Sequence, residues 1–68
     1  MEDKQKICRL LFEALKATRN QSDLREIVYS RESDDREAVT LVYKRGKMVI
    51  NVSMDSGIAM IRDILRAL

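Results

Sequence analysis

Few residues of this chain have side chains that could take part in catalysis. Histidine is absent and Cys8 is the single cysteine, so the usual general base near neutral pH is missing and the serines have no visible activating partner. Cys8 falls within the apolar pattern of a helix, where a small buried hydrophobe is expected and a reactive thiol is not. We therefore expect no enzyme, no catalytic residue and no cofactor, although a pocket that perturbs a carboxylate or a thiol would not be visible in a sequence.

Oxygen ligands for a cation gather at Glu32, Asp34 and Asp35. Their spacing matches no calcium-binding loop with defined ligand positions, and Arg31 and Arg36 flank them. A solvated turn explains the same residues. Because the chain has one cysteine and no histidine, it also lacks a set of zinc ligands. We predict that it binds no metal ion.

The polar segment Asp55-Ser56-Gly57 could form an anion-binding helix start, since free backbone N–H groups point outward there. Helix capping accounts for the segment without a ligand, because Ser53, Asp55 or Ser56 could each accept a hydrogen bond from a backbone N–H. Gly46 and Gly57 are the two glycines and lie in separate contexts, so the chain has no glycine-rich phosphate loop. We favour the cap.

Lys44, Arg45 and Lys47 make one end of a hairpin basic, and such an end can contact phosphates. The whole chain has a formal net charge of only +2, from 13 basic and 11 acidic residues, which is less than most nucleic-acid-binding proteins show. No aromatic platform for stacking bases accompanies the three cations. Weak nucleic-acid binding through phosphate contacts is therefore our alternative hypothesis, and a merely solvated hairpin end would have the same sequence.

The hairpin spans residues 38–53 and is the strongest structural signal in the chain. With Arg45 and Gly46 at its tip, the numbers of paired residues sum to 91, the value of 45 plus 46. A register shifted by one residue would move core side chains to the wrong face. A two-residue and a four-residue loop both stay open, because Gly46 suits a positive φ and Arg45 does not. One face is then apolar at every pair, namely Tyr43 with Met48, Leu41 with Ile50, and Val39 with Val52.

Two amphipathic helices are predicted to flank the strands. Residues 2–19 carry apolar side chains at helical spacing, and a polar connector follows at 18–23. The second helix follows the polar segment at 53–57. Its principal apolar stripe is expected to contain Ile58, Ile61, Leu65 and Leu68, with Met60 and Ile64 beside it.

A first strand is predicted over residues 24–30, in which Ile27 and Tyr29 share one face and Val28 takes the other. A charged loop at 31–36 leads to the hairpin, and antiparallel pairing is the simplest connection. The predicted fold class is therefore α+β. Its order is a helix, a three-stranded antiparallel sheet and a helix (αβββα), with both helices on one sheet face.

At 68 residues the chain is a single small domain, 1–68, with a core close to the size at which self-association is a common support. It shows no signal peptide and no long apolar run, which predicts a cytoplasmic protein without membrane contact. Val28, Val42 and Val49 on the outer sheet face, together with the broad apolar surface of the last helix, exceed what such a small monomer readily hides. Our leading hypothesis is a non-enzymatic interaction module, a homodimer or a partner of another protein, that uses one of these two surfaces.

Overall fold

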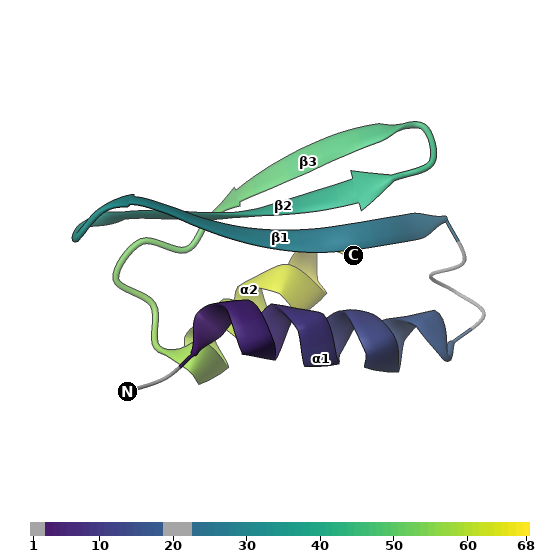
Figure 1. Cartoon of the computed structure of the whole chain (residues 1–68), viewed down its shortest axis with the longest axis horizontal. Helices are drawn as coiled ribbons and strands as arrows, with labels where there is room; N and C mark the ends of the chain where they lie inside the picture. The colour runs from purple at the N-terminus through teal and green to yellow at the C-terminus, as the bar shows by residue number, and fades with distance from the viewer. Residues whose placement is uncertain (1–2, 19–22) are drawn as a thin grey trace.

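Two helices lie against one face of a three-stranded antiparallel sheet in the computed structural model of the protein, which describes residues 3–18 and 23–68 (Figure 1). The strands follow one another in the sheet in the order β1-β2-β3. This arrangement confirms the predicted α+β class, the αβββα order and the placement of both helices on the same side. The elements are α1 (Lys4–Lys16), β1 (Leu24–Ser33), β2 (Arg36–Tyr43), β3 (Gly46–Asn51) and α2 (Gly57–Ala67).

Helix α1 begins after Asp3, whose carboxylate accepts a hydrogen bond from the backbone N–H of Lys6 at 3.0 Å. This side chain satisfies one of the free N–H groups at the helix start. Lys16 lies in the last turn, where a cation complements the helix dipole. The helix is shorter than the predicted 2–19, and residue 2 and residues 19–22 of the predicted helix and connector fall outside the described residues.

Strands β1 and β2 extend further than the sequence predicted. The segment 31–36 was expected to be a loop, but the turn contains only Asp34 and Asp35, and both strands run up to it. The prediction was wrong because the ends of these strands pair through their backbones, which leaves no apolar alternation to detect. The pairing shifts register once near each end of β1. As predicted, Ile27 is buried, Tyr29 is half-buried and Val28 is exposed.

The β2–β3 hairpin turns at Lys44 and Arg45, one residue earlier than predicted. The paired residue numbers sum to 89, as in Leu41 with Met48 and Tyr43 with Gly46, so the predicted register was wrong by two residues. A two-residue shift leaves every side chain on the same face, so the apolar pattern could not separate the two registers. The loop has two residues, and Gly46, which would have suited a positive φ, does not adopt one.

The core lies between the sheet and the helices. Cys8 is 1% exposed there, as its position in an apolar stripe predicted. Burial raises the pKa of its thiol to about 11, so the reactive thiolate is scarce near neutral pH. Eight side chains make up the buried cluster: Cys8, Leu24, Ile27, Val39, Leu41, Val52, Met60 and Ile64.

Helix α2 begins after Ser56, whose hydroxyl accepts a hydrogen bond from the backbone N–H of Ala59 at 3.1 Å. Of the three predicted capping residues, Ser56 is therefore the one that caps. In the described residues, neither helix is long and apolar enough to cross a membrane.

The buried stripe of α2 differs from the predicted one. Met60 and Ile64 are fully buried, whereas Ile58 is 81% exposed and Leu65 is 49% exposed. The helix has apolar residues around much of its circumference, so its sequence offers more than one stripe. The helical pattern alone therefore does not select the stripe that meets the sheet, and Met54 in the preceding turn adopts a φ of 65°.

Candidate functional site: the uncovered face of the sheet

The sheet face opposite the helices is not covered by any described element (Figure 1). The strand register places Val28 beside Thr40, and Thr40 beside Val49, in one row across the sheet. Val42 lies in the middle strand, two residues along from Thr40. The three valines singled out from the sequence therefore share one surface. We call it the outer face, formed by Glu26, Val28, Ser30, Ala38, Thr40, Val42, Lys47, Val49 and Asn51.

Exposure differs among the three valines of the outer face. Val49 is 68% exposed and Val28 is 37% exposed, while Val42 is half-buried by its neighbours. Val49 lies on β3, at one edge of the sheet, and Val28 lies on β1, at the other. The largest apolar exposure of the outer face is therefore at the β3 edge.

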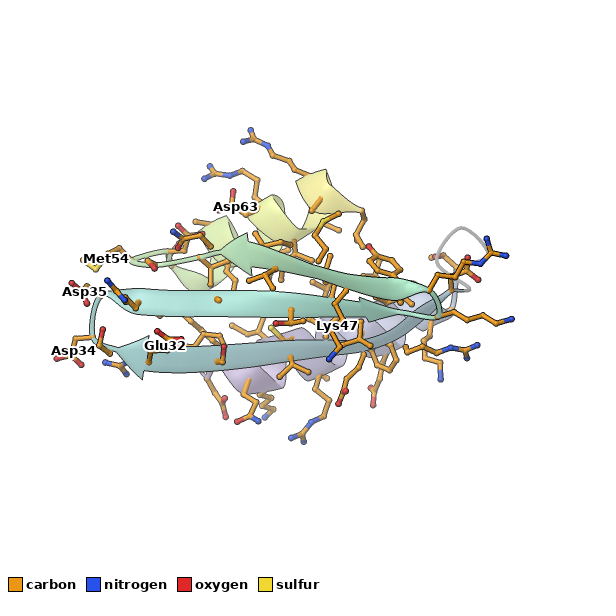
Figure 2. All side chains as sticks on the ribbon, turned by 90° about the horizontal axis from the view of Figure 1, so that it is seen from above. Glu32, Asp34, Asp35, Lys47, Met54 and Asp63 are labelled. Atoms are coloured by element: carbon orange, nitrogen blue, oxygen red, sulfur yellow. The ribbon has the colours of Figure 1, made fainter. Side chains whose placement is uncertain are left out.

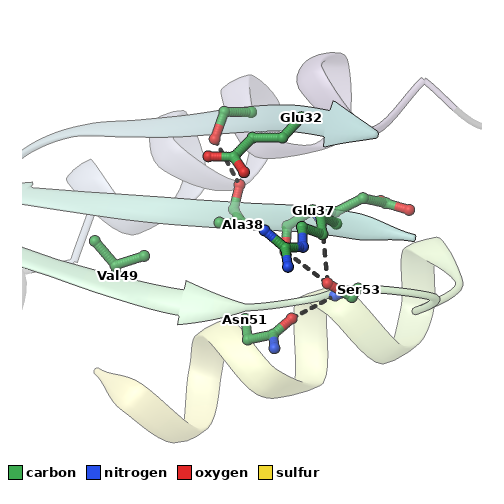
Figure 3. Close-up of a pocket in the computed structure, with 8 residues that line it drawn as sticks. Glu32, Glu37, Ala38, Val49, Asn51 and Ser53 are labelled. Atoms are coloured by element: carbon green, nitrogen blue, oxygen red, sulfur yellow. Dashed lines mark hydrogen bonds between the residues drawn. The ribbon is translucent and has the colours of Figure 1, made fainter. Parts of the chain in front are cut away.

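A shallow pocket of about 340 Å³ lies at one end of the outer face (Figure 3). Two of its polar side chains bond to neighbouring backbone: the Ser30 hydroxyl donates to the Ala38 carbonyl at 3.5 Å, and the Asn51 side-chain oxygen accepts from the Ser53 N–H at 2.8 Å. These contacts hold the chain in place. The lining residues are Ser30, Glu32, Arg36, Glu37, Ala38, Val49, Asn51 and Ser53.

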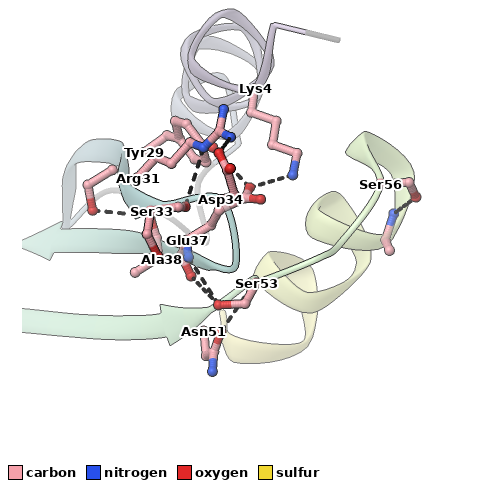
Figure 4. Close-up of polar contacts among 12 residues, drawn as sticks. Lys4, Tyr29, Arg31, Ser33, Asp34, Glu37, Ala38, Asn51, Ser53 and Ser56 are labelled. Atoms are coloured by element: carbon pink, nitrogen blue, oxygen red, sulfur yellow. Dashed lines mark hydrogen bonds and ion pairs between the residues drawn. The ribbon is translucent and has the colours of Figure 1, made fainter. Parts of the chain in front are cut away.

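Glu37 connects three separate parts of the chain (Figure 4). Its Oε2 atom accepts hydrogen bonds from Lys4 Nζ at 2.5 Å and from Tyr29 Oη at 2.9 Å. Its backbone N–H donates to the Ser53 hydroxyl at 3.0 Å. The side chains of Lys4 and Glu37 are only 15% and 9% exposed. The contacts therefore join α1, the sheet and the segment before α2.

The Glu37 contacts alter proton binding. Hydrogen bonds from Lys4 and then Tyr29 lower the pKa of Glu37, and the bond to Glu37 raises the pKa of Lys4. The pKa of the Tyr29 hydroxyl is raised, first by burial and then by its bond to Glu37. The sequence alone did not predict this cluster, because Lys4 is far from Glu37 in the chain. The β1–β2 register would have revealed part of it, since it brings Tyr29 and Glu37 onto one face.

A pair of carboxyl groups, Asp55 and Asp63, was also missed. The Oδ2 atom of Asp55 is buried, and no group in residues 3–18 and 23–68 forms a hydrogen bond with this atom. The pKa of Asp55 is raised, first by a hydrogen bond with Asp63 and then by burial, while the charges of Arg62 and Lys4 act in the opposite direction. Two carboxyl groups can share a hydrogen bond only when one holds a proton, so the pair retains a proton more strongly than an isolated aspartate does.

In the acidic turn between β1 and β2, the carboxylates of Asp34 and Asp35 are each bonded to a nearby residue of β1. Arg31 contacts Asp34 at 2.5 Å, and the Ser33 hydroxyl donates to Asp35 at 2.7 Å. Within residues 3–18 and 23–68, no three cysteine or acidic side chains lie close enough together to hold a metal ion. These interactions are those of a surface turn, and Glu32 lies beside it in β1.

Lys44, Arg45 and Lys47 lie toward the end of the sheet opposite that turn, because β2 runs from the acidic turn to the β2–β3 turn; Figure 2 labels Lys47, Asp34 and Asp35. Lys44 and Arg45 form the turn of the hairpin, and Lys47 lies on the outer face beside Val42. All three are exposed. Tyr43, the nearest aromatic residue, belongs to the core side of the sheet and is half-buried, so it offers no stacking surface next to the cations.

Further apolar side chains are exposed on the two helices and on the turn before α2. Leu10 is 54% exposed, and Met54 is 78% exposed. Ile58 and Leu65 of α2 are also among them, as described above. The protein therefore exposes apolar side chains on both of its layers.

Comparison with known proteins gives no match. No family model matches the chain, and no curated protein or solved structure matches it either. Three kinds of feature therefore bear on function: the outer face, the hairpin turn with Lys44 and Arg45, and the carboxyl groups of Glu37 and of the pair Asp55 and Asp63.

Proposed function

We propose that the protein is a non-enzymatic interaction module in which the surface around Val49, on the edge strand β3, joins two copies into a homodimer. The exposure of Val49 on the uncovered sheet face is the observation that carries this proposal. Val42 and Val28 lie on the other two strands, further from this edge, and are less exposed than Val49. Burying such side chains against a second copy would remove apolar area from water, worth about 25 cal/mol per Å².

The size of the core supports the same proposal. Eight buried side chains are a small core for a chain of 68 residues, and domains of this size are frequently stabilised by association. The chemistry of the described residues also favours binding over catalysis. Cys8 is buried with a raised pKa, and in the shallow outer-face pocket the Ser30 and Asn51 side chains are already bonded to backbone.

Sedimentation equilibrium tests the proposal. We expect a dimer at micromolar concentrations, and Val49→Lys should weaken it because a charge would have to be buried in the contact. Leu65→Lys, at an exposed position of α2, is the matched control and should leave the dimer intact. Weakening by Leu65→Lys alone would place the contact on the last helix, and a strict monomer at high micromolar concentration would contradict self-association.

A second candidate function is weak nucleic-acid binding through Lys44, Arg45 and Lys47. The observation that favours it is the clustering of these exposed cations at one end of the sheet, away from the acidic turn (Figure 2). If three phosphates are contacted on duplex DNA, the logarithm of the binding constant should fall with the logarithm of salt concentration with a slope of about −2.7. Absence of binding to DNA and RNA at low salt would exclude this function.

A further inference from the structure

We propose that two copies of the chain pair antiparallel through their β3 strands, so that the two sheets become one continuous sheet. This inference rests on the proposed self-association and specifies its geometry: the contact is made by the edge of the sheet, and not by stacking of two outer faces. The backbone, the side chains and the register of β3 each support it.

The backbone of β3 has unpaired groups on its free side. The Val52 N–H donates to the Glu37 carbonyl at 3.0 Å, which shows that even-numbered positions of this segment direct their hydrogen-bonding groups toward β2. These directions alternate along an antiparallel strand. The N–H and C=O groups of Lys47, Val49 and Asn51 therefore point to the open edge, where a further strand can pair with them.

The side chains of β3 are exposed on both faces of the sheet. Met48, on the helix side, is 43% exposed, and its neighbour Val49, on the outer face, is 68% exposed. Stacking of two outer faces would cover Val49 and leave Met48 in water. A strand added at the edge would contact both residues, because it places neighbouring side chains above and below the sheet.

The sequence of β3 is complementary to itself. When Val49 lies opposite Val49 of the second copy, Met48 lies opposite Ile50 on the helix side, and Lys47 lies opposite Asn51 on the outer face. Lys47, Val49 and Asn51 can then all exchange backbone hydrogen bonds, about six in total. Lys47 is the one charged residue of the strand, and in this register the two lysines do not face each other.

The other edge of the sheet is less suited to pairing. The register of β1 shifts near both of its ends, and such irregularities disrupt the row of backbone groups that a new strand needs. Side chains from α1, including Arg9 and Phe12, line a depression beside β1. β3 pairs with β2 without a register shift and contains no proline, so it is the edge at which a second copy can add.

Two substitutions on opposite sides of the sheet separate edge pairing from face stacking. Met48→Glu places a charge beside Ile50 of the second copy and should raise the dimer dissociation constant about tenfold or more. Val28→Lys, on the outer face but on the far strand, should change it less than about twofold. Both positions are already partly exposed, so the monomer should keep its fold, which circular dichroism can check.

A backbone substitution provides a second test. Val49→Pro removes an N–H that points to the open edge, so it should abolish pairing without breaking a bond between β2 and β3. Val49→Ala is its control, since it trims the side chain and keeps the N–H. We expect a monomer for the proline variant and a weakened dimer for the alanine variant.

Oxidative cross-linking reports the register directly. Residues that face each other in a hydrogen-bonded antiparallel pair have Cα atoms about 5.5 Å apart, within the range of a disulfide. Val49→Cys should therefore form a covalent dimer, and Val28→Cys should not. The native Cys8 is buried with a pKa of about 11, so it should not contribute.

The outcomes distinguish this inference from the function on which it rests. A dimer that is weakened by Met48→Glu and cross-linked through Val49→Cys supports edge pairing. A dimer that resists Met48→Glu and Val49→Pro but is weakened by Val28→Lys overturns edge pairing and leaves self-association standing. A strictly monomeric wild-type protein overturns both.

Discussion

The contact between Asp55 and Asp63 makes the folded protein sensitive to pH at one pair of residues. The pKa of Asp55 is raised in the fold, so the folded protein binds a proton more tightly than the unfolded chain does. The free energy of unfolding must then fall as the pH rises from the unfolded pKa through the raised, folded one. Near neutral pH the pair therefore lowers the free energy of unfolding.

Asp63→Asn should remove this cost. An amide at this position can donate a hydrogen bond to the Asp55 carboxylate without a bound proton, so we expect the variant to be more stable than the wild type at pH 7 and to lose that advantage below about pH 3, where aspartates are protonated. Urea denaturation across this pH range measures the effect. Glu32→Gln, which changes the net charge equally at the acidic turn, is the control; an equal gain from it would point to general electrostatics.

Glu37 should show the opposite pH dependence. Its pKa is lowered by Lys4 and Tyr29, so its contribution to stability is present above the unfolded pKa and is lost as the pH falls through the folded one. We expect Glu37→Gln to be less stable than the wild type at pH 7, with the difference shrinking in acid. Tyr29→Phe, which removes one of the two hydrogen bonds, should have a smaller effect. A difference that does not change with pH would contradict the role given to the carboxylate.

At the scale of the elements, the β2–β3 turn is tolerant of a side chain at Gly46. The φ of this glycine is not positive, and a Cβ built there would meet nothing within 4 Å. Gly46→Ala should therefore stabilise the protein by about 0.4–1 kcal/mol, mainly by restricting the unfolded chain. Thermal or urea denaturation can measure this. A clear destabilisation would show that the turn needs glycine after all.

The same elements show what the sequence could and could not predict. Alternation in residues 38–53 identified the inner and outer faces correctly, because a register error of two residues preserves the faces. It could not fix the turn, since both registers satisfy the pattern. For α2, the apolar residues were recognised, but the helical pattern alone does not select Met60 and Ile64 over Ile58 and Leu65.

The candidate functional residues also divide into those that the sequence predicted and those that it did not. Val28, Val42 and Val49 were found from alternation alone, because exposure of a sheet face follows from where the helices pack. The contact between Lys4 and Glu37 joins residues far apart in the chain. The contact between Asp55 and Asp63 depends on the direction in which helix α2 continues from its N-cap, Ser56. No local pattern records either contact.

For the whole molecule, the small core makes each buried side chain important. Leu41 is fully buried in the central strand, and Leu41→Ala should lower the free energy of unfolding by about 2–5 kcal/mol. That is a large share of the 5–15 kcal/mol typical of folded domains. Leu65→Ala, at an exposed position, should change stability by no more than about 0.5 kcal/mol. Equal losses at the two positions would place Leu41 outside the core.

The methionines of the described residues lie in three different environments, which makes them chemical reporters. Met54 is 78% exposed, Met48 is 43% exposed and Met60 is fully buried. Oxidation of a thioether to a sulfoxide follows its exposure, so dilute peroxide should modify Met54 first, Met48 next, and Met60 only when the protein unfolds. If β3 strands pair, peptide mass spectrometry should find that raising the protein concentration shields Met48 while Met54 oxidises at an unchanged rate.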